Sequence, residues 1–260
     1  MKLVRIDPPG TFCSNEALRD LVKQTGAKTF VDVGCGNGTI SKLLCSMGMS
    51  GTGVDFSKLS LETSAVTLKD EIAAGRYKLV EGDATKLETP LEPADLVLSY
   101  MVMEHVHDDV GFVQTLSSLT KKGGYLALCV PGRRDRWSFE DETVGHLRRY
   151  DRGDLDGVLS KGGLKNVQVW SVGVPIGNIT FSASKWLVEH SKEKEKLGQS
   201  QREQTESSGV RDIPWKTVFP APFKLLLNRV TLFPLFVIQR FFYRSKMGIT
   251  MLGFGKVGSS

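Results

Sequence analysis

The chain lacks the features that mark a zinc-bound or disulfide-stabilised protein. Its four cysteines are scattered over 260 residues, with no CxxC pair and no histidine at ligand spacing. This usage fits a reducing compartment, so a cytoplasmic protein is expected. The opening residues, MKLVRIDPPGTF, carry charge but no long apolar stretch, and a secretory signal is therefore not expected.

Long hydrophobic runs are also missing, and acidic residues are scarce towards the C-terminal end. The predominantly apolar run from Val230 to Ile238 has nine residues and contains Pro234, whereas a bilayer-spanning helix needs about 20. From Arg211 onwards the chain has eight basic residues and one acid, against a formal net charge of +5 for the whole. These basic residues are spread through apolar sequence without a solvent-facing stripe, so nucleic acid is not expected as a partner.

Apolar strands and helices alternate through the first half of the chain. The strands are rich in Val and Leu without clean alternation, which is typical of a parallel sheet buried on both faces. The sequence therefore predicts an α/β fold with a doubly wound, mainly parallel sheet. After a helix at 14–25, strands are expected at 28–33, 50–56, 76–83, 94–100 and 124–130, with helices at 38–48, 57–74 and 108–121.

The second half completes the sheet and adds an insertion. A helix near 152–161 leads to a strand at 164–174, and the alternating segment 248–257 is expected to pair antiparallel with it. The sheet would then have seven strands, with residues 1–174 and 248–257 as the core. Residues 175–247 would form a helical insertion or cap. Within it, the charged run 190–209 is interpreted as a solvated helix end or a flexible linker.

The segment FVDVGCGNGTIS, residues 30–41, places three glycines where the first strand meets its helix. Gly34, Gly36 and Gly38 have GxGxG spacing, and Thr39 stands where a dinucleotide fingerprint has its third glycine. The lysine of a phosphate-binding P-loop is missing too. A plain strand–helix turn remains an alternative to a ligand-binding loop.

Acidic residues follow the next two strands. Asp55 ends the second strand, where a carboxylate can accept hydrogen bonds from both hydroxyls of a ribose. Asp83 ends the third strand, where it or the next backbone amide can contact an exocyclic amino group. Ligands of open α/β sheets bind outside the carboxyl ends of the strands. Each acid could instead cap the helix that follows it. Together with the glycines, however, they predict an adenosyl pocket.

Five segments resemble successive motifs of class I S-adenosylmethionine-dependent methyltransferases: VDVGCGNG, GVDFS, EGDAT, ADLVLSYMVMEHV and GGYLALCVPG. The resemblance covers roughly residues 28–175 and implies a Rossmann-like methyltransferase fold with an antiparallel last strand. It also implies S-adenosyl-L-methionine as cofactor and S-adenosyl-L-homocysteine as product. By this resemblance the cofactor lies against Asp32, Gly34, Gly36, Asn37 and Gly38 (methionine part), Asp55 and Phe56 (ribose and adenine), Asp83 and Ala84 (adenine edge), and Ser99, Tyr100 and Met101 (near the sulfonium).

Methyl transfer to a hydroxyl needs a proton acceptor beside the aligned reactants. The candidates are Glu104, His105, His107 and His146, although Glu104 and His105 could simply hold their loop by hydrogen bonds. The segment GHLRRY resembles one in bacterial small-molecule methyltransferases. By that resemblance Arg148 and Tyr150 face the acceptor or pin the loop over it.

Some members of the family bind Mg²⁺ through an ExxEH pattern. Met101 occupies the first glutamate position of that pattern here, so no metal is expected.

The sequence thus predicts a methyltransferase that acts on oxygen of a small-molecule, sugar or lipid-linked acceptor. Alternatives are an N- or C-methyltransferase of a natural-product or quinone-like molecule, a catalytically inactive cofactor-binding homologue, and a nicotinamide dehydrogenase. Two interpretations of residues 215–246 stay open. The segment either roofs the acceptor pocket or lies in a membrane interface as a peripheral contact.

Overall fold

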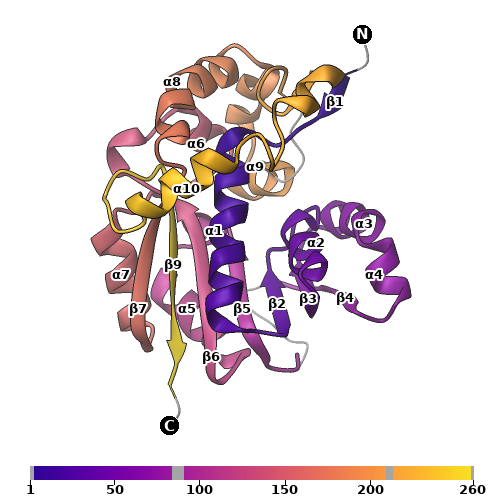
Figure 1. Ribbon diagram of the computed structural model, residues 1–260, viewed down its shortest axis with the longest axis vertical. Helices are drawn as coiled ribbons and strands as arrows, with labels where there is room; N and C mark the ends of the chain where they lie inside the picture. The colour runs from indigo at the N-terminus through magenta and orange to yellow at the C-terminus, as the bar shows by residue number, and fades with distance from the viewer. Residues whose placement is uncertain (1–2, 84–90, 209–212, 259–260) are drawn as a thin grey trace.

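A seven-stranded sheet forms the centre of the protein (Figure 1). The computed structural model describes residues 3–83, 91–208 and 213–258. The strand order is β4-β3-β2-β5-β6-β9-β7, and only β9 runs antiparallel to its neighbours. The predicted fold class is therefore confirmed. The strands are β2 (Thr29–Val33), β3 (Ser50–Asp55), β4 (Tyr77–Glu81), β5 (Ala94–Tyr100), β6 (Thr120–Pro131), β7 (Leu164–Val172) and β9 (Thr250–Val257).

Helices cover both faces of this sheet and create two apolar cores. On one face, α1 (Pro9–Thr25) and α2 (Thr39–Ser46) pack through residues such as Leu18 and Leu44. On the other, α5 (Asp109–Ser118) and α7 (Arg152–Lys161) pack through residues such as Leu116 and Leu155. Because both faces are covered, the central strands are apolar on both sides, which is why their sequences do not alternate.

Two helices differ from their expected extents. Helix α1 begins at Pro9 rather than near residue 14, because Pro8 is extended and proline suits the first helical position. The helix expected at 57–74 divides at Leu68 into α3 (Lys58–Thr67) and α4 (Lys69–Ala73).

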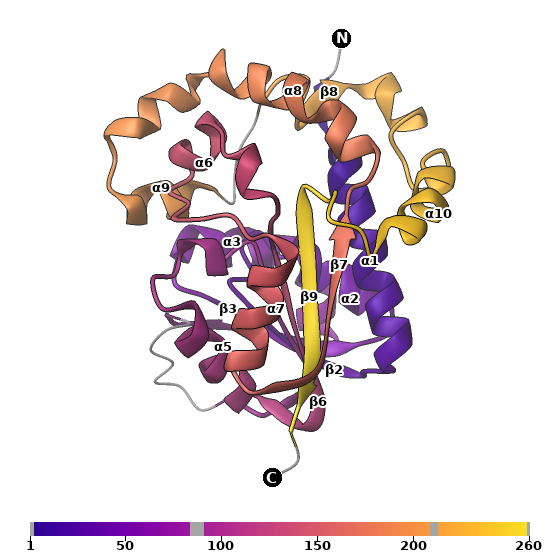
Figure 2. The same ribbon diagram turned by 90° about the vertical axis from the view of Figure 1, so that its left-hand side faces the viewer.

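The chain between β7 and β9 leaves the sheet and forms a layer beyond the carboxyl ends of the parallel strands (Figure 2). This layer contains α8 (Ile176–Glu189), α9 (Gln201–Ser208), α10 (Phe233–Phe242) and β8 (Val218–Pro220), which pairs with β1 (Leu3–Arg5). Short helices complete it: α6 (Phe139–Thr143) and the 3₁₀ helices η1 (Met103–His105), η2 (Arg134–Arg136), η3 (Lys192–Gly198) and η4 (Ala221–Leu225).

The antiparallel pairing predicted between the last two strands is present, from Leu164 opposite Val257 to Val172 opposite Thr250. The division into core and cap, and the flexibility of 190–209, stay predictions. Within the described ranges, none of the helices is both long enough and apolar enough to cross a bilayer.

Candidate active site

A cavity of about 840 Å³ lies at the carboxyl ends of β2, β3, β4 and β5. Loops that follow parallel strands converge on this edge of the sheet, so residues distant in sequence meet there. We call it the first cavity. Most of the residues expected to bind cofactor line it: Asp32, Gly34, Gly36, Asn37, Asp55, Phe56, Asp83, Tyr100 and Met101. Ala84 lies outside the described residues.

The three glycines of the loop are required by its conformation, and two of them also by its packing. Gly34, Gly36 and Gly38 have φ of 75°, 53° and 78°, a region that favours glycine. A Cβ on Gly34 would lie 2.4 Å from Cγ2 of Val102, and one on Gly38 would lie 2.4 Å from Oγ of Ser64. The chain's own side chains therefore exclude a Cβ at these two positions. Gly38 is not among the described residues that line the cavity, and its contact with cofactor stays a prediction.

Asp55 joins the glycine loop to the start of α3. Its Oδ2 accepts a hydrogen bond from the Gly36 amide at 2.8 Å, and its Oδ1 accepts one from the Ser57 amide at 2.9 Å. A carboxylate has about four lone-pair sites, so acceptor capacity remains for hydroxyl groups in the cavity. Beside it, the Arg202 guanidinium lies 5.4 Å from the centre of the Phe56 ring.

Asp32 is fully buried under the glycine loop. Its Oδ2 accepts a hydrogen bond from Ser41 Oγ at 2.7 Å, but its Oδ1 has no hydrogen-bond partner among the described residues. Burial raises the pKa of this carboxyl to about 7. A buried acceptor without a partner costs free energy, so a cationic donor in the cavity would be stabilised here. The ammonium group of S-adenosylmethionine is such a donor, and the site fits it.

Ser99 and Met101 both lie near the end of β5, but their side chains have different environments. Ser99 is buried in the sheet, where its Oγ donates to the Val33 carbonyl at 2.8 Å, and it does not line either cavity described for this chain. Its expected place near the sulfonium stays a prediction. Met101 lines the first cavity with φ of 56°, a strained value for a side chain of its size. Its amide is held by the Cys129 carbonyl at 2.8 Å.

A second cavity, of about 780 Å³, lies between the sheet and the layer above it. Its walls come from the N-terminal segment, α6, α8, η4 and the loop before β8. Four residues line both cavities: Asn37, Tyr100, Met101 and His105. The two cavities therefore meet at the carboxyl end of β5.

His105 stands at this junction with a defined tautomer. Its Nδ1 lies 3.1 Å from the Gly145 carbonyl, which can only accept, so Nδ1 carries the proton. Burial, with a smaller effect from nearby His146, lowers the pKa of His105 to about 4. The ring is therefore neutral near pH 7, and its Nε2 has a free lone pair for a proton.

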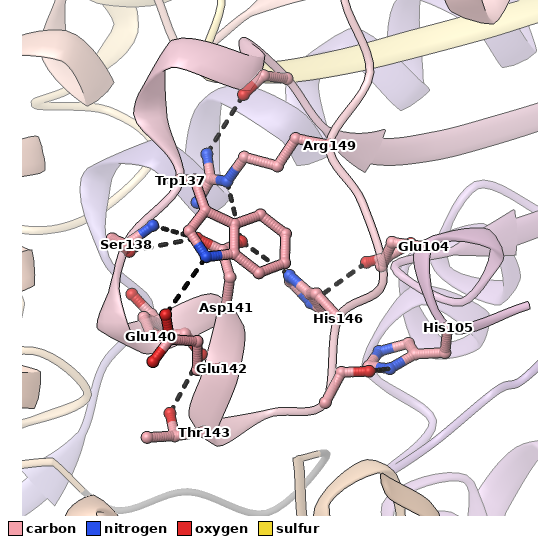
Figure 3. A network of polar contacts seen from close by, with 12 residues as sticks. Glu104, His105, Trp137, Ser138, Glu140, Asp141, Glu142, Thr143, His146 and Arg149 are labelled. Atoms are coloured by element: carbon pink, nitrogen blue, oxygen red, sulfur yellow. Dashed lines mark hydrogen bonds and ion pairs between the residues drawn. The ribbon is translucent and has the colours of Figure 1, made fainter.

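A polar network lies directly behind His105 (Figure 3). His146 Nδ1 is 2.8 Å from Oδ1 of Asp141, which also accepts from Arg149 Nε at 2.8 Å. His146 Nε2 lies 3.6 Å from Oε1 of Glu104, whose fully buried carboxyl oxygens have no hydrogen-bond partner among the described residues. The imidazole rings of His105 and His146 meet edge to face, 4.9 Å apart.

The two carboxyl groups of this network have opposite pKa shifts. Burial raises the pKa of Glu104 to about 7. Burial acts in the same direction on Asp141, but hydrogen bonds from His146 and Arg149 outweigh it and lower the pKa to about 2. Asp141 is thus the permanent anion that orients His146, whereas Glu104 changes charge near neutral pH.

Glu104, His105 and His146 also have ligand atoms within 4.8 Å of one another, a grouping that could hold a metal ion. The absence of a metal, expected from Met101, stays a prediction.

Arg148 and Tyr150 are absent from the linings of both cavities. Arg148 donates to Asp109 at 3.1 Å and to the His107 carbonyl at 2.9 Å, and the Tyr150 hydroxyl donates to Asp109 at 3.1 Å. Their contact with acceptor stays a prediction. They pin the 145–150 loop to the start of α5, the other role considered for them.

No sequence pattern indicates that α9 helps to form the site. Gln201, Arg202 and Thr205 line the first cavity, and Gln201 Nε2 donates to the carbonyls of His105 and Gly145 at 3.3 Å each. These residues lie in the charged run 190–209, which has no apolar periodicity that could have placed it against the core.

Comparison with known proteins agrees with this geometry. Residues 31–128 match the family described as "Methyltransferase domain". A ubiquinone biosynthesis O-methyltransferase of Nitrosomonas europaea is 30% identical over 107 residues, which are 41% of this chain and 45% of that protein. Residues 31–128 are therefore similar to a methyltransferase domain, and part of the chain is similar to an O-methyltransferase.

Solved structures share the fold of this methyltransferase domain. The magnesium protoporphyrin IX methyltransferase of Synechocystis PCC 6803, solved with bound S-adenosylhomocysteine, aligns with TM-score 0.53 at 17% identity, over 64% of this chain and 78% of that one. The [4+2]-cyclase SpnF aligns with TM-score 0.59 at 16% identity, over 94% and 82%. At such identities the likeness shows the fold alone, and the chain spans less than half of the curated relative above.

Replacement of Asp55 by Ala is expected to weaken S-adenosylhomocysteine binding by about tenfold to a hundredfold, because charge-assisted hydrogen bonds are lost. Isothermal calorimetry measures this, with circular dichroism to verify folding. Glu81→Ala, an exposed acid at the end of the neighbouring strand, is the matched control and should bind normally. Wild-type affinity in folded Asp55→Ala would count against the ribose role.

Glu104 should make stability fall as pH rises. Because its pKa in the folded protein, about 7, exceeds the ordinary 4.5, its contribution is complete below pH 4.5 and is lost by about pH 7. The free energy of unfolding is measured with urea at about pH 5 and about pH 8. Between these pH values it should fall by about 3 kcal/mol more in the native protein than in Glu104→Gln. The melts are run with and without EDTA, since a bound cation would keep Glu104 ionised. Parallel pH profiles in EDTA would contradict the assignment.

Proposed function

We propose that the protein transfers a methyl group from S-adenosyl-L-methionine to an oxygen atom of an acceptor held in the second cavity. The observation that carries this proposal is the junction of the two cavities at Asn37, Tyr100, Met101 and His105. A group bound in the first cavity can be reached from the second only where the two are continuous. The relative from Nitrosomonas europaea is named an O-methyltransferase, which supports the choice of oxygen.

The chain's own residues supply binding and orientation. When bound, S-adenosylmethionine supplies an electrophilic methyl group on a sulfonium. Asp55 would accept the ribose hydroxyls, and the unpartnered Oδ1 of Asp32 would meet the ammonium group. The glycine loop, fixed by Val102 and Ser64, gives this cradle a rigid wall, so alignment requires little reorganisation.

His105 is the proposed general base. An alcohol is a weak nucleophile and must lose its proton as the new bond forms. The Nε2 of His105 is unprotonated at neutral pH and stands at the junction. Behind it, Glu104 and His146, which Asp141 orients, are proposed to position the His105 ring.

The second cavity fits an acceptor with a polar end and an apolar body. His105, His146 and Arg149 line it near the junction, whereas Phe181, Phe219, Phe223 and Ile249 supply apolar walls. Small molecules are held in cavities of this kind by apolar walls and a few placed polar groups. A sugar alone would leave these aromatic walls unused, so a lipid-linked or otherwise amphiphilic acceptor suits the cavity better.

Other functions have less support. A nicotinamide dehydrogenase would need the third glycine that Thr39 replaces. SpnF, which shares the fold, is a [4+2]-cyclase, so the fold by itself does not establish methyl transfer. N- or C-methylation and an inactive cofactor-binding homologue stay alternatives.

The proposal is tested by an acceptor screen that detects S-adenosylhomocysteine formation, with hydroxylated amphiphiles among the candidates. With an active acceptor, His105→Asn should lower kcat by about a hundredfold or more, because a general base contributes roughly that factor. Its affinity for S-adenosylhomocysteine should change little. His190→Asn, on the exposed end of α8, is the matched control and should be fully active.

Two results would overturn the proposal. One is tight binding of NAD with no binding of S-adenosylhomocysteine. The other is undiminished turnover in His105→Asn, which would remove the general base while leaving cofactor use intact.

A further inference from the structure

Helix α10 and the 3₁₀ helix η4 expose an unusual amount of apolar surface. Phe233, Val237 and Phe241 are spaced four residues apart, so they lie on one face of α10, and Phe241 is 83% exposed. Just before the helix, Leu225 is 76% exposed and Val230 82%. We call these residues, together with Leu226, the docking surface. Large exposed apolar patches usually mark interaction sites.

The opposite side of α10 is firmly attached to the core, so the docking surface is not a loosely held end. Phe236 and Gln239 are buried there. Gln239 accepts from the Gly173 amide at 2.8 Å and donates to the Cys13 carbonyl at 2.9 Å. On the flank, Arg240 pairs with Asp20 on α1 at 2.7 Å. A helix that is apolar on both faces needs a second apolar environment on its outer side.

Charge distinguishes among the environments that could cover this surface. The sequence from 213 to 260 contains no Asp or Glu, whereas residues 216–246 contain six basic residues: Lys216, Lys224, Arg229, Arg240, Arg244 and Lys246. Apolar side chains flanked by cations match the interface of an anionic bilayer. Three of the six pair with acids of other elements, Lys216 with Glu140, Arg229 with Glu16 and Arg240 with Asp20. Lys224, Arg244 and Lys246 have no ion pair among the described residues. A twofold pair of this chain would bring these cations towards the like charges of the second copy, whereas an anionic bilayer would neutralise them.

The docking surface also reaches the mouth of the second cavity. Phe223, Leu226 and Leu227 line that cavity, and Leu226 is 64% exposed. A residue that is both lining and exposed marks a place where the cavity opens to the outside. In Figures 1 and 2 the same segment, coloured from orange to yellow, runs from the upper layer down to α1.

We propose that the docking surface binds the interface of an anionic lipid bilayer, so that the second cavity opens towards the lipid at Leu226. The enzyme then takes an amphiphilic acceptor directly from the bilayer, with its apolar chain between η4 and α8 and its hydroxyl at His105. This last step rests on the proposed function, whereas binding to the bilayer does not.

Vesicle sedimentation tests the docking surface without any acceptor. The full chain is mixed with vesicles of phosphatidylcholine containing phosphatidylglycerol, and with phosphatidylcholine alone. It should bind the anionic vesicles preferentially. Phe241→Ser should lower the partition coefficient roughly tenfold, because a phenyl ring no longer leaves water. Val66→Ser, an exposed apolar residue on α3 away from the docking surface, is the matched control and should bind normally.

The basic residues provide an independent readout. The triple variant Lys224→Gln, Arg244→Gln, Lys246→Gln should bind anionic vesicles at least tenfold more weakly and should lose most of the salt dependence of binding. Lys69→Gln with Lys78→Gln, on the far edge of the sheet, is the control and should behave as the native chain.

The orientation of the cavity mouth is measured with a fluorophore. All four native cysteines are buried, so Leu226→Cys can be labelled selectively with an environment-sensitive dye. Its emission should shift to the blue when anionic vesicles are added, and the same dye on Val66→Cys should not respond.

Failure to bind anionic vesicles would overturn the proposal, as would vesicle binding that Phe241→Ser leaves unchanged. Concentration-dependent dimerisation abolished by Phe241→Ser, with no vesicle binding, would assign the surface to a second copy of the chain. None of these results depends on S-adenosylhomocysteine binding, which calorimetry measures separately, so failure of the proposed function remains distinguishable.

Discussion

The geometry of the first cavity depends on one carboxylate, that of Asp55. By accepting the amides of Gly36 and Ser57, it ties the loop after β2 to the start of α3. The loop itself is constrained from the other side by Val102 and Ser64, which occupy the space that a Cβ on Gly34 or Gly38 would need. A ligand that bonds to Asp55 therefore meets a wall that is already in place, and binding loses little conformational entropy.

The network behind His105 depends on a contrast between two buried carboxyl groups. Asp141 is stabilised as an anion by His146 and Arg149, whereas Glu104 receives no comparable hydrogen bond and resists ionisation. His146 is held between them, and His105 packs against its ring while bonding to Gly145. Each group limits the movement of the next, so the position of the proposed base depends on a network of several buried residues.

Much of the fold and of the cofactor cavity could be predicted from the sequence, because both depend on local signals. Strand–helix alternation predicted the sheet, and the acids at Asp55 and Asp83 predicted its ligand-binding edge. Whether the Ser99 side chain is buried in the sheet or faces the cavity could not be predicted, because a difference of one residue at the end of a strand changes this. Arg148 binds Asp109, which lies far away in the sequence at the start of α5. Helix α9 contacts His105 but has no apolar periodicity from which this contact could be predicted. Such contacts depend on tertiary packing and leave no local pattern.

The central claim is that the two cavities meet at the place of methyl transfer. A crystal structure of the full chain with S-adenosylhomocysteine measures this most directly. We expect the ribose hydroxyls at Asp55 and the sulfur at the junction lined by Tyr100, Met101 and His105, facing the second cavity. A nucleoside bound in the second cavity, or a sulfur turned away from the junction, would contradict the account.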